Sequence, residues 1–437
     1  MTAARRKTVT VVGAGAAGLT AAIRAAEAGA RVVLLNAHPK VGLKILMSGG
    51  TRCNVTHREV TERDYHGGSR PFVARVLRAF TADQARAWLE SLGVGLKLEK
   101  TGKYFPASDD AQTVLNALLA EAARAGVKLR NGARVVRIER GFRLGIQSVA
   151  DSAAFAPVTS IGRAEWPAHD AEPDEWIEAD AVVLASGGLS FPRTGSDGVG
   201  YSLAQSLGHS IVPTIPALTP LAAGDPLCTS LQGVTLDVEL SLWMGGRRGE
   251  RISGSFLFAH FGYSGPAALD FSRHWLRGSL SGADLRVTAS FLPGITADAL
   301  TAEWVSVAQT RPRAIVRRWL GERLPDRLVL ALCAEVGVDP AALASQVVRQ
   351  GRSRLVARLT ARELPVTGTL GYEKAEVTAG GVALDQVNPS TLESRIVPGM
   401  FLCGEILDVE GRLGGFNFQW SWSSGTVAGR SVGRLVS

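Results

Sequence analysis

The sequence predicts an α/β protein in which a parallel-sheet domain is interrupted by a β and an α insertion. Residues 8–35 run through a β-rich segment, a glycine-rich turn, an alanine-rich helix and a second β-rich segment. Short alternating apolar runs with turn signals occupy residues 211–292, and residues 297–350 carry alanine, leucine and arginine at helical spacing. The α/β pattern returns near residue 375. A sheet domain with two insertions is the simplest arrangement that fits this order.

The individual elements follow from these patterns. "TVTVV" predicts the first strand at residues 8–12, the helix after it extends to about Ala28, and "RVVLL" predicts the second strand at residues 31–35. The other elements expected before residue 190 are helices within 71–92 and 110–125, two short strands within 126–139, a hairpin or loop elaboration at 141–179 and a buried strand within 179–188.

The first turn carries the pattern G-x-G-x-x-G at Gly13, Gly15 and Gly18. Gly13 permits the tight turn, Gly15 lets the backbone approach a pyrophosphate, and Gly18 lets the helix and the strand pack closely. The helix begins with free N–H groups and the positive end of its dipole, which bind phosphates. Because the pattern lies between a strand and a helix, it predicts a dinucleotide-binding site.

The end of the second strand lacks the acid that usually binds the adenosine ribose, because Asn36 stands there. An asparagine accepts from one hydroxyl and donates to another, so it binds the ribose more weakly than a carboxylate does. Loss of the charge also removes a barrier to a 2′-phosphate. This position therefore does not separate FAD from NADP.

The C-terminal block indicates which dinucleotide binds. It reads "VPGMFLCGEILDVEGRLGGFNFQWSWSSGTVAGRSVG" and predicts a strand ending at Gly404 and Glu405, a glycine-bearing loop and a helix from about Gln419. A late strand that ends in glycine and an acid is typical of two-half FAD proteins, in which the carboxylate accepts from the ribityl chain. The N-terminus of the next helix can stabilise negative charge on the flavin. A buried turn acid followed by a core helix is the alternative interpretation.

The stretch "KILMSGGTRCNVT" at residues 44–56 raises three possibilities: a catalytic cysteine, a metal half-site or backbone shaped for a cofactor. A reactive thiol needs a base or a resolving partner, and no other cysteine lies near Cys53 in the sequence. We interpret the stretch as a flavin cradle, in which Gly49 and Gly50 let the backbone pass close to the flavin and pyrophosphate. Arg52 offers charge to a phosphate or the ring, and Asn54 offers a donor and an acceptor. A redox role for Cys53 stays open.

Taken together, these segments resemble one family almost end to end, the BaiN/RdsA-type NAD(P)/FAD-dependent oxidoreductases (aminoacetone-oxidase-family FAD-binding flavoproteins). The segments that carry the resemblance are "VVGAGAAGL", "KVGLKILMSGGTRCNVT", "GKYFPASDDAQTVLNAL", "LASGGLSFPRTGSDGVGYSLAQSLGH", "AHFGYSGPAALDFSR", "AEVTAGGV" and "FLCGEILDVEGRLGGFNFQWSWSSG". The chain departs from the family at Asn36, at Thr51 where a third glycine is common, and in the irregular stretch 141–179.

The resemblance implies a Rossmann-like FAD-binding domain of discontinuous segments, with an inserted antiparallel β-barrel domain and a small α-helical domain. The expected boundaries are 1–195 and 367–437 for the FAD-binding domain, 196–295 with 340–366 for the barrel, and 296–340 for the helical domain. The expected cofactor-binding residues are Gly13, Gly15, Ala16, Ala17, Gly18, Asn36, Lys44, Gly49, Gly50, Arg52, Asn54, Val135, Gly187, Gly404, Glu405, Gly415, Asn417 and Phe418.

Candidate catalytic residues are few. In the family, the loop containing "AHFGYSGPA" projects from the inserted domain toward the flavin, so the resemblance implies that His260, Tyr263 or Ser264 supplies a proton or a hydrogen bond to the substrate. A histidine that caps the following helix is an equally good interpretation of His260. Cys53 completes the set of candidates.

Two kinds of substrate agree with the resemblance. FAD in this architecture implies hydride transfer, and the chain has no second G-x-G-x-x-G, so NADH or NADPH is expected to bind transiently over the flavin. The first expectation is a small-molecule ene-type reductase or oxidase that acts on a conjugated C=C bond, and the alternative is a ribosomal RNA dihydrouridine synthase that reduces the uracil C5–C6 bond. A non-catalytic flavin-binding module is the third hypothesis.

The composition of the chain indicates which classes of binding partner and which cellular compartment to expect. The 437-residue chain has a formal net charge of +8, which favours a polyanionic partner such as RNA, although no compact basic run follows residue 7. Four scattered cysteines argue against a disulfide scaffold and suit a reducing cytoplasm. The histidines lack metal-ligand spacing, so no metal is expected. The sequence also predicts no membrane span, and it leaves the oligomeric state undetermined.

Overall fold

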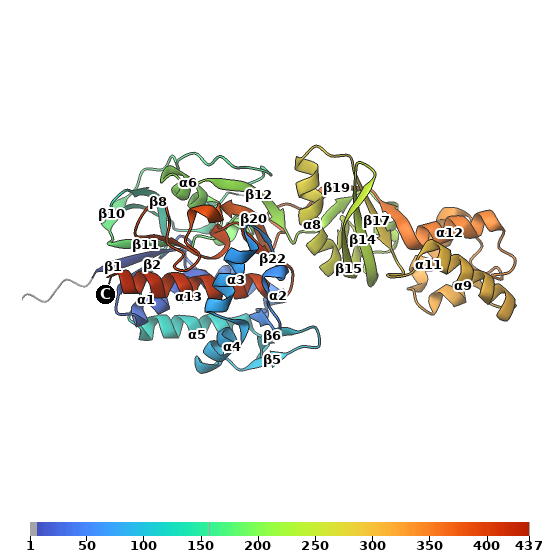
Figure 1. The fold of residues 1–437 in the computed structure, drawn as a ribbon, viewed down its shortest axis with the longest axis horizontal. Helices are drawn as coiled ribbons and strands as arrows, with labels where there is room; N and C mark the ends of the chain where they lie inside the picture. Colours follow the sequence, from blue (N-terminus) through green and yellow to red (C-terminus); the bar gives the residue numbers. More distant parts are fainter. Residues whose placement is uncertain (1–6, 157, 437) are drawn as a thin grey trace, which may run out of the picture. The chain divides into compact units, whose positions relative to one another are not determined.

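The computed structural model describes residues 7–156 and 158–436 and divides into two compact units (Figure 1). The first unit combines the chain up to Ala217 with the chain from Tyr372 onward, and the second unit is Leu218–Gly371. Segments from both ends of the sequence therefore build one unit around an insertion.

Five parallel strands form the central sheet of the first unit, in the order β21–β11–β1–β2–β7. Their bounds are β21 (Met400–Leu402), β11 (Ala181–Leu184), β1 (Thr8–Val12), β2 (Arg31–Asn36) and β7 (Lys128–Asn131). β1 lies at the centre, and its Val9 and Val11 are fully buried. Burial on both faces explains why β11 and β21 read as continuous apolar runs rather than as alternating ones, whereas the edge strand β7 is polar and mostly exposed.

Two helices from opposite ends of the sequence pack side by side, α1 (Ala16–Glu27) and α13 (Phe416–Val436) (Figure 1). Gly425, Gly429 and Gly433 recur every four residues and form one stripe along α13. A Cβ at Gly425 would lie 2.5 Å from the carbonyl oxygen of Ala17, and one at Gly429 would lie 2.4 Å from that of Ala21. The absence of side chains at this stripe therefore sets the spacing of the two helices. The helix was expected from about Gln419 and begins at Phe416.

The rest of the first unit surrounds this layer. Its further helices are α2 (Leu43–Thr51), α3 (Arg70–Ala79), α4 (Ala82–Ser91), α5 (Ala111–Arg124) and α6 (Val199–Ser206). Its small sheets pair β8 (Ala133–Glu139), β9 (Arg143–Ser148) and β10 (Glu175–Glu178); β3 (Thr56–His57), β5 (Leu96–Leu98) and β6 (Lys103–Pro106); β4 (Tyr65–Gly67) and β22 (Val409–Gly411); and β12 (Ile211–Ala217) and β20 (Val377–Val382).

Two of these sheets refine the sequence-based expectations. The stretch 141–179, expected as a hairpin or loop elaboration, supplies β9 and β10, which extend β8 into an antiparallel sheet, with irregular chain between them. β12 pairs antiparallel with β20, and this pairing joins residues 211–217 to the first unit. The first unit therefore extends to Ala217 rather than to residue 195.

The second unit contains an antiparallel sheet and a group of helices. The sheet order is β18–β17–β14–β15–β16–β13–β19, and whether it closes into a barrel stays a prediction. The strands are β13 (Leu221–Ala223), β14 (Thr235–Met244), β15 (Arg247–Ala259), β16 (Gly262–Ser264), β17 (Leu285–Ser290), β18 (Arg362–Leu364) and β19 (Val366–Thr369). The helices are α7 (Pro226–Ser230), α8 (Gly265–Leu280), α9 (Ala297–Thr310), α10 (Val316–Gly321), α11 (Asp326–Val336) and α12 (Arg349–Ala361).

Candidate cofactor site

The glycine-rich turn lies between β1 and α1, as its pattern predicted. A Cβ at Gly13 would lie 2.4 Å from the carbonyl oxygen of Ala185, and one at Gly18 would lie 1.8 Å from the carbonyl oxygen of Gly13. Gly13 also has a φ of 104°, which other residues rarely adopt. No residue larger than glycine fits at either position. The turn therefore brings β1, α1 and the end of β11 into contact.

The N-terminus of α1 is open on the side where a pyrophosphate would bind. Gly15 is its N-cap residue, it provides no side-chain cap, and no heavy atom lies within 4 Å of the position of a Cβ there. Ala16, Ala17 and Gly18 form the first turn, whose N–H groups have no acceptor within the helix. Free N–H groups and the helix dipole attract an anion to this end. This cradle fits the pyrophosphate of a dinucleotide.

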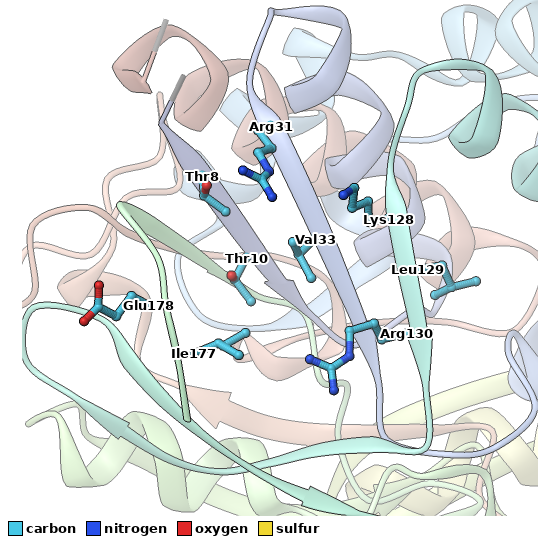
Figure 2. A pocket seen from close by; sticks show the side chains of 9 residues that line it. All are labelled: Thr8, Thr10, Arg31, Val33, Lys128, Leu129, Arg130, Ile177 and Glu178. Atoms are coloured by element: carbon cyan, nitrogen blue, oxygen red, sulfur yellow. The ribbon is translucent and has the colours of Figure 1, made fainter. Parts of the chain in front are cut away.

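A separate cavity of about 540 Å³ lies on the same sheet (Figure 2). It is lined by Thr8 and Thr10 of β1, Arg31 and Val33 of β2, Lys128, Leu129 and Arg130 of β7, and Ile177 and Glu178 of β10. It includes the first residues of β1, β2 and β7, whereas the glycine turn follows the last residue of β1. In open α/β sheets, ligands bind at the carboxyl ends of the strands. We therefore assign this cavity no part in the cofactor site.

Asn36 holds the loop that follows β2. Its Nδ2 donates to the carbonyl oxygens of His38 at 2.6 Å and Lys40 at 3.1 Å, and it lies 3.2 Å from Oδ1 of Asn131 on β7. The side chain is buried, with 8% of its surface exposed. A carboxylate at this position would face three oxygen atoms. The loop therefore favours an amide over a carboxylate at position 36. Only Oδ1 of Asn36 is available to accept a hydrogen bond from a ribose hydroxyl.

Glu405 lies at the centre of a hydrogen-bond network that draws on four segments of the first unit. Its Oε2 accepts from Nζ of Lys44 at 2.7 Å, and its Oε1 accepts from Oγ of Ser190 at 2.8 Å and from the N–H of Thr378 at 2.9 Å. Lys44 also donates to Ser190 at 2.7 Å. A carboxylate offers about four acceptor positions, so one position on Oε2 is left. That position suits a hydroxyl such as the one expected from the ribityl chain.

Sequence reasoning missed two members of this network, Ser190 and Thr378. Thr378 also accepts from the N–H groups of Leu189 and Ser190 through Oγ1, so it fixes the turn after β11. Both residues stand in segments that resemble the family, "LASGGLSFPR" and "AEVTAGGV". Serine and threonine are common in turns, and neither segment carried a charge pattern that would have singled them out.

The stretch "SGGTRCN" departs from regular helix at its centre. Ser48 has extended dihedral angles, and Gly49 and Gly50 adopt left-handed ones, with φ of 56° and 66°. Thr51 and Cys53 also have positive φ, 70° and 60°. Such a run turns the backbone sharply, and nothing lies within 4 Å of a Cβ position at Gly50. This geometry agrees with a backbone cradle, the role expected for Gly49 and Gly50.

Arg52 is neutralised within the protein. Its guanidinium donates to Glu99 at 2.7 Å, lies 3.4 Å from Asp109 and stacks over the ring of Phe105 at 4.0 Å. Hydrogen bonding to Glu99 raises the pKa of Arg52. With two carboxylates beside it, this side chain carries little free charge for a phosphate. The cofactor-binding role expected for Arg52 is therefore not favoured by its contacts.

The N-terminus of α13 faces the cradle stretch. Asn54 is 8% exposed, and its Oδ1 is buried without a donor among the described residues. This oxygen lies 2.6 Å from the position that a Cβ at Gly415 would take, so residue 415 must be small. Asn417 is tied back to Gly411, whose N–H it accepts at 2.7 Å, and Phe418 stacks on the ring of Trp422. An acceptor without a donor beside a helix N-terminus fits a bound group that carries an N–H.

The remaining expected residues lie at close contacts of the first unit. Val135 is buried in β8, where the pairing with β9 shifts register between Val135 and Arg137. A Cβ at Gly187 would lie 3.0 Å from Oγ of Ser196. A Cβ at Gly404 would lie 2.7 Å from that of Ala17, so Gly404 joins the end of β21 to α1. These contacts explain the small residues at positions 187 and 404, and a role in cofactor binding stays a prediction.

The environment of Cys53 argues against redox chemistry. The thiol is fully buried, and burial raises its pKa to about 12. All four cysteines are buried and free of disulfides. A nucleophilic cysteine needs a lowered pKa and access to solvent or substrate. Cys53 has neither, so the structure favours a packing role for it.

The two candidates in the second unit have opposite environments. Tyr263 is fully buried and donates to Oδ2 of Asp225 at 2.6 Å, and the same oxygen accepts from Arg362 at 2.6 Å. Burial raises the pKa of Tyr263, and so does the hydrogen bond to Asp225. His260 is exposed on the tight turn between β15 and β16. Tyr263 therefore stabilises the sheet, and of the two only His260 is accessible for proton transfer.

Residues 7–156 and 158–436 contain no group of three or more histidine, cysteine or acidic side chains placed to hold a metal ion. Within the same residues, no helix has the length and apolar character needed to span a membrane.

The fold and the site together define a class, the Rossmann-type dinucleotide-binding flavoprotein oxidoreductases. The model of the HI0933-like protein Rossmann domain matches residues 7–431, and the chain belongs to this family. The BaiN/RdsA-type resemblance is thereby confirmed.

Three relatives cover nearly the whole chain. The chain is 32% identical to the 3-dehydro-bile acid delta(4,6)-reductase of Clostridium scindens, over 97% of this chain and 98% of the relative. It is 31% identical to the ribosomal RNA dihydrouridine synthase of Escherichia coli, over 95% of each chain. It is 30% identical to the ribosomal RNA dihydrouridine synthase of Haemophilus influenzae, over 97% of this chain and 98% of the relative.

Proposed function

We propose that the protein uses FAD, reduced by NADH or NADPH, to reduce a C=C bond that is conjugated to a carbonyl group. Bound FAD would supply a hydride acceptor and donor, which amino-acid side chains do not provide. The observation that carries the proposal is the network around Glu405, with one acceptor position left, beside the open N-terminus of α1. Both features fit FAD, and both are built from segments of the first unit.

Each residue of the cradle would have a defined task. The N–H groups of the first turn of α1 would bind the pyrophosphate, Glu405 would accept from a ribityl hydroxyl, and Lys44 would orient the carboxylate through its hydrogen bond to Oε2. Asn54 would accept an N–H of the flavin through its Oδ1. His260 is our candidate for donating a proton to the substrate carbon next to the site of hydride addition.

The names of the relatives support this class of reaction. A delta(4,6)-reductase and a dihydrouridine synthase both saturate a C=C bond in conjugation with a carbonyl group. We propose a small conjugated ketone as one substrate class and the uracil C5–C6 bond of ribosomal RNA as the second. The formal net charge of +8 favours the second, because RNA is a polyanion. Work on ribosomal RNA would also place the protein in the cytoplasm.

Anaerobic absorbance spectroscopy tests the proposal. Purified protein reconstituted with FAD should lose its flavin absorbance band when NADH or NADPH is added, and the band should return when a conjugated acceptor is added without oxygen. Free FAD at the same concentration is the control. A band that persists with both reductants identifies a passive flavin-binding module and contradicts the proposal.

Mass spectrometry separates the two substrate classes. Ribosomal RNA from a strain that lacks the gene should contain less dihydrouridine than RNA from the parent strain, and expression of the gene should restore it. Unchanged dihydrouridine would exclude the RNA substrate and leave the small conjugated acceptor.

A further inference from the structure

The helices of the second unit carry an arginine-rich segment that the flavin chemistry does not use. Residues 340–362 contain Arg349, Arg352, Arg354, Arg358 and Arg362 and no acidic residue. Most of this segment is α12, which packs beside α9 and α11 (Figure 1). The segment therefore carries five positive charges and no negative one.

Two of the five arginines have structural partners. Arg358 donates to Oε1 of Glu335 at 2.7 Å, and Arg362 lies 3.1 Å from Oε2 of the same residue and binds Asp225. Arg349, Arg352 and Arg354 form no ion pair with any residue that the structure describes. Arg349 and Arg354 are exposed, and Arg352 is partly exposed. We call these three residues the α12 arginines.

The stability of α12 does not account for the α12 arginines. All three lie within its first six residues, where the helix dipole favours acids and disfavours cations. Val348 is the N-cap residue and provides no side-chain cap, so the charges are not offset there. A surface that keeps unpaired cations at an unfavourable position is expected to bind anions.

The geometry points to RNA rather than to a membrane. Arginine binds phosphate through paired N–H groups, so exposed arginines without a carboxylate partner suit a phosphodiester backbone. A helix that lies on a membrane exposes an apolar face, but Leu355, Val356 and Leu359 of α12 are buried in the second unit. Val348 is the single large apolar side chain exposed in this segment, at 70%. We propose that the α12 arginines bind the phosphate backbone of an RNA substrate, an inference that rests on the proposed reduction of uracil in ribosomal RNA.

Equilibrium binding to RNA tests the proposal. The probe is bacterial large-subunit ribosomal RNA, transcribed in vitro and therefore unmodified, and the protein is the full-length FAD-loaded chain. In the triple variant Arg349→Gln, Arg352→Gln, Arg354→Gln, the Kd should rise about tenfold or more, and the slope of log Kd against log salt should fall by about 2 to 3. The rate of flavin reduction by NADPH should stay unchanged. Removing cations from a helix N-terminus should not destabilise the fold. Circular dichroism of the variant checks that it is folded.

A charge-matched control separates position from net charge. Arg311, Arg317 and Arg323 are also surface residues of the second unit, but each is paired with an acid, at 2.6, 2.5 and 2.8 Å respectively. Their triple glutamine variant loses the same three charges and should keep its Kd within about twofold, since paired cations contribute little to the field. Equal weakening in both variants, or no weakening in either, overturns the proposal.

Two additional measurements distinguish a failure of the proposed RNA-binding surface from a failure of the proposed function. Vesicles of phosphatidylglycerol are the competing probe, and α12-dependent binding to vesicles without binding to RNA overturns the choice of RNA. The proposed function is assessed separately, by whether the reduced flavin of the unaltered protein is reoxidised by uridine-containing RNA. Reoxidation that is equally fast in the unaltered protein and the α12 variant, at limiting RNA, rejects the docking surface while the proposed function stands.

Discussion

The ammonium group of Lys44 lies 2.7 Å from Oε2 of Glu405, although the two residues are 361 positions apart in the chain. The pair joins α2 of the N-terminal segment to the end of β21 in the C-terminal segment. The side chains are 25% and 17% exposed. The ion pair therefore orients the Glu405 carboxylate, which we expect to bind the ribityl chain. It also links the N-terminal and C-terminal segments of the first unit.

Removing either member of this pair should weaken FAD binding. Glu405→Ala deletes an acceptor used by Lys44, Ser190 and Thr378, so the Kd for FAD should rise about a hundredfold; Lys44→Met should raise it about tenfold. Isothermal titration of the apoprotein with FAD measures both values. Arg311→Met, which breaks the exposed pair with Glu322, is the control and should leave the Kd unchanged. Full flavin retention in Glu405→Ala contradicts the assignment.

Replacing Asn36 with the acid that is usual at the end of β2 should lower the stability of this protein. In Asn36→Asp, a carboxylate would face the carbonyl oxygens of His38 and Lys40, where the amide now donates. We expect a loss of about 1–3 kcal/mol in the free energy of unfolding and no gain in FAD affinity. Chemical denaturation and FAD titration measure the two effects. Tighter FAD binding in the variant would show that the loop accommodates an acid.

The buried cysteines should make the protein less stable at high pH. Burial raises the pKa of Cys53 and Cys403 to about 12 and that of Cys228 and Cys333 to about 11, above the ordinary value of 9.0. The unfolded chain then releases thiol protons first, so the free energy of unfolding falls as the pH rises from 9 through 11–12, by at most about 1.4 kcal/mol per thiol per pH unit. Urea denaturation at pH 8 and 10 in the presence of a reductant measures this dependence.

Cys53→Ala isolates the contribution of one thiol. The variant should show a shallower fall between pH 8 and 10 and should keep its turnover within about twofold, because the thiol is buried and protonated. Loss of turnover with unchanged flavin content would instead indicate direct redox chemistry at Cys53.

Tyr263 should act on stability rather than on catalysis. Tyr263→Phe removes one donor to Asp225 and leaves Arg362 in place, so we expect a loss of about 1–2 kcal/mol in the free energy of unfolding. Flavin reduction and substrate reduction should both stay near their original rates. His260→Ala is the comparison, and it should slow substrate reduction more than flavin reduction. If Tyr263→Phe slows turnover without loss of stability, the tyrosine takes part in the reaction.

The glycine stripe of α13 should tolerate no added methyl group. In Gly429→Ala, the new Cβ would lie 2.4 Å from the carbonyl oxygen of Ala21, so α1 and α13 must separate. We expect a loss of about 1–3 kcal/mol in the free energy of unfolding. Gly321→Ala in α10 is the matched control, because no atom lies within 4 Å of its Cβ position. Equal stability of the two variants would contradict the close packing of the helices.

Local patterns in the sequence were sufficient to predict the Rossmann-type core. The β-branched run before Gly13, the spacing of Gly13, Gly15 and Gly18, and the alanine-rich helix after them all depend on contacts within about twenty residues, which the sequence displays directly. The boundary of the first unit was harder to predict, because residues 211–217 belong to it only through pairing with β20, more than 160 residues later.

The roles of the charged and polar site residues depended on the tertiary structure. Position and residue type identified Arg52, Cys53 and Tyr263 as candidates, but their partners come from distant segments: Glu99 and Asp109 neutralise Arg52, burial keeps Cys53 protonated, and Asp225 engages Tyr263. The ion pair between Lys44 and Glu405 likewise could not be predicted from the sequence, because the two residues are 361 positions apart.

The sequence by itself thus determined the family, the glycine turn and the arginines at helical spacing within residues 297–350, because each depends on residue identity and short spacing. Only the tertiary structure decided which charges are free. Arg349, Arg352 and Arg354 have no ion-pair partner within residues 7–156 and 158–436, whereas Arg358 and Arg362 are bound by Glu335. The reason is physical: the effective charge and pKa of a side chain depend on its burial and on its neighbours in space, and folding brings those neighbours from anywhere in the chain.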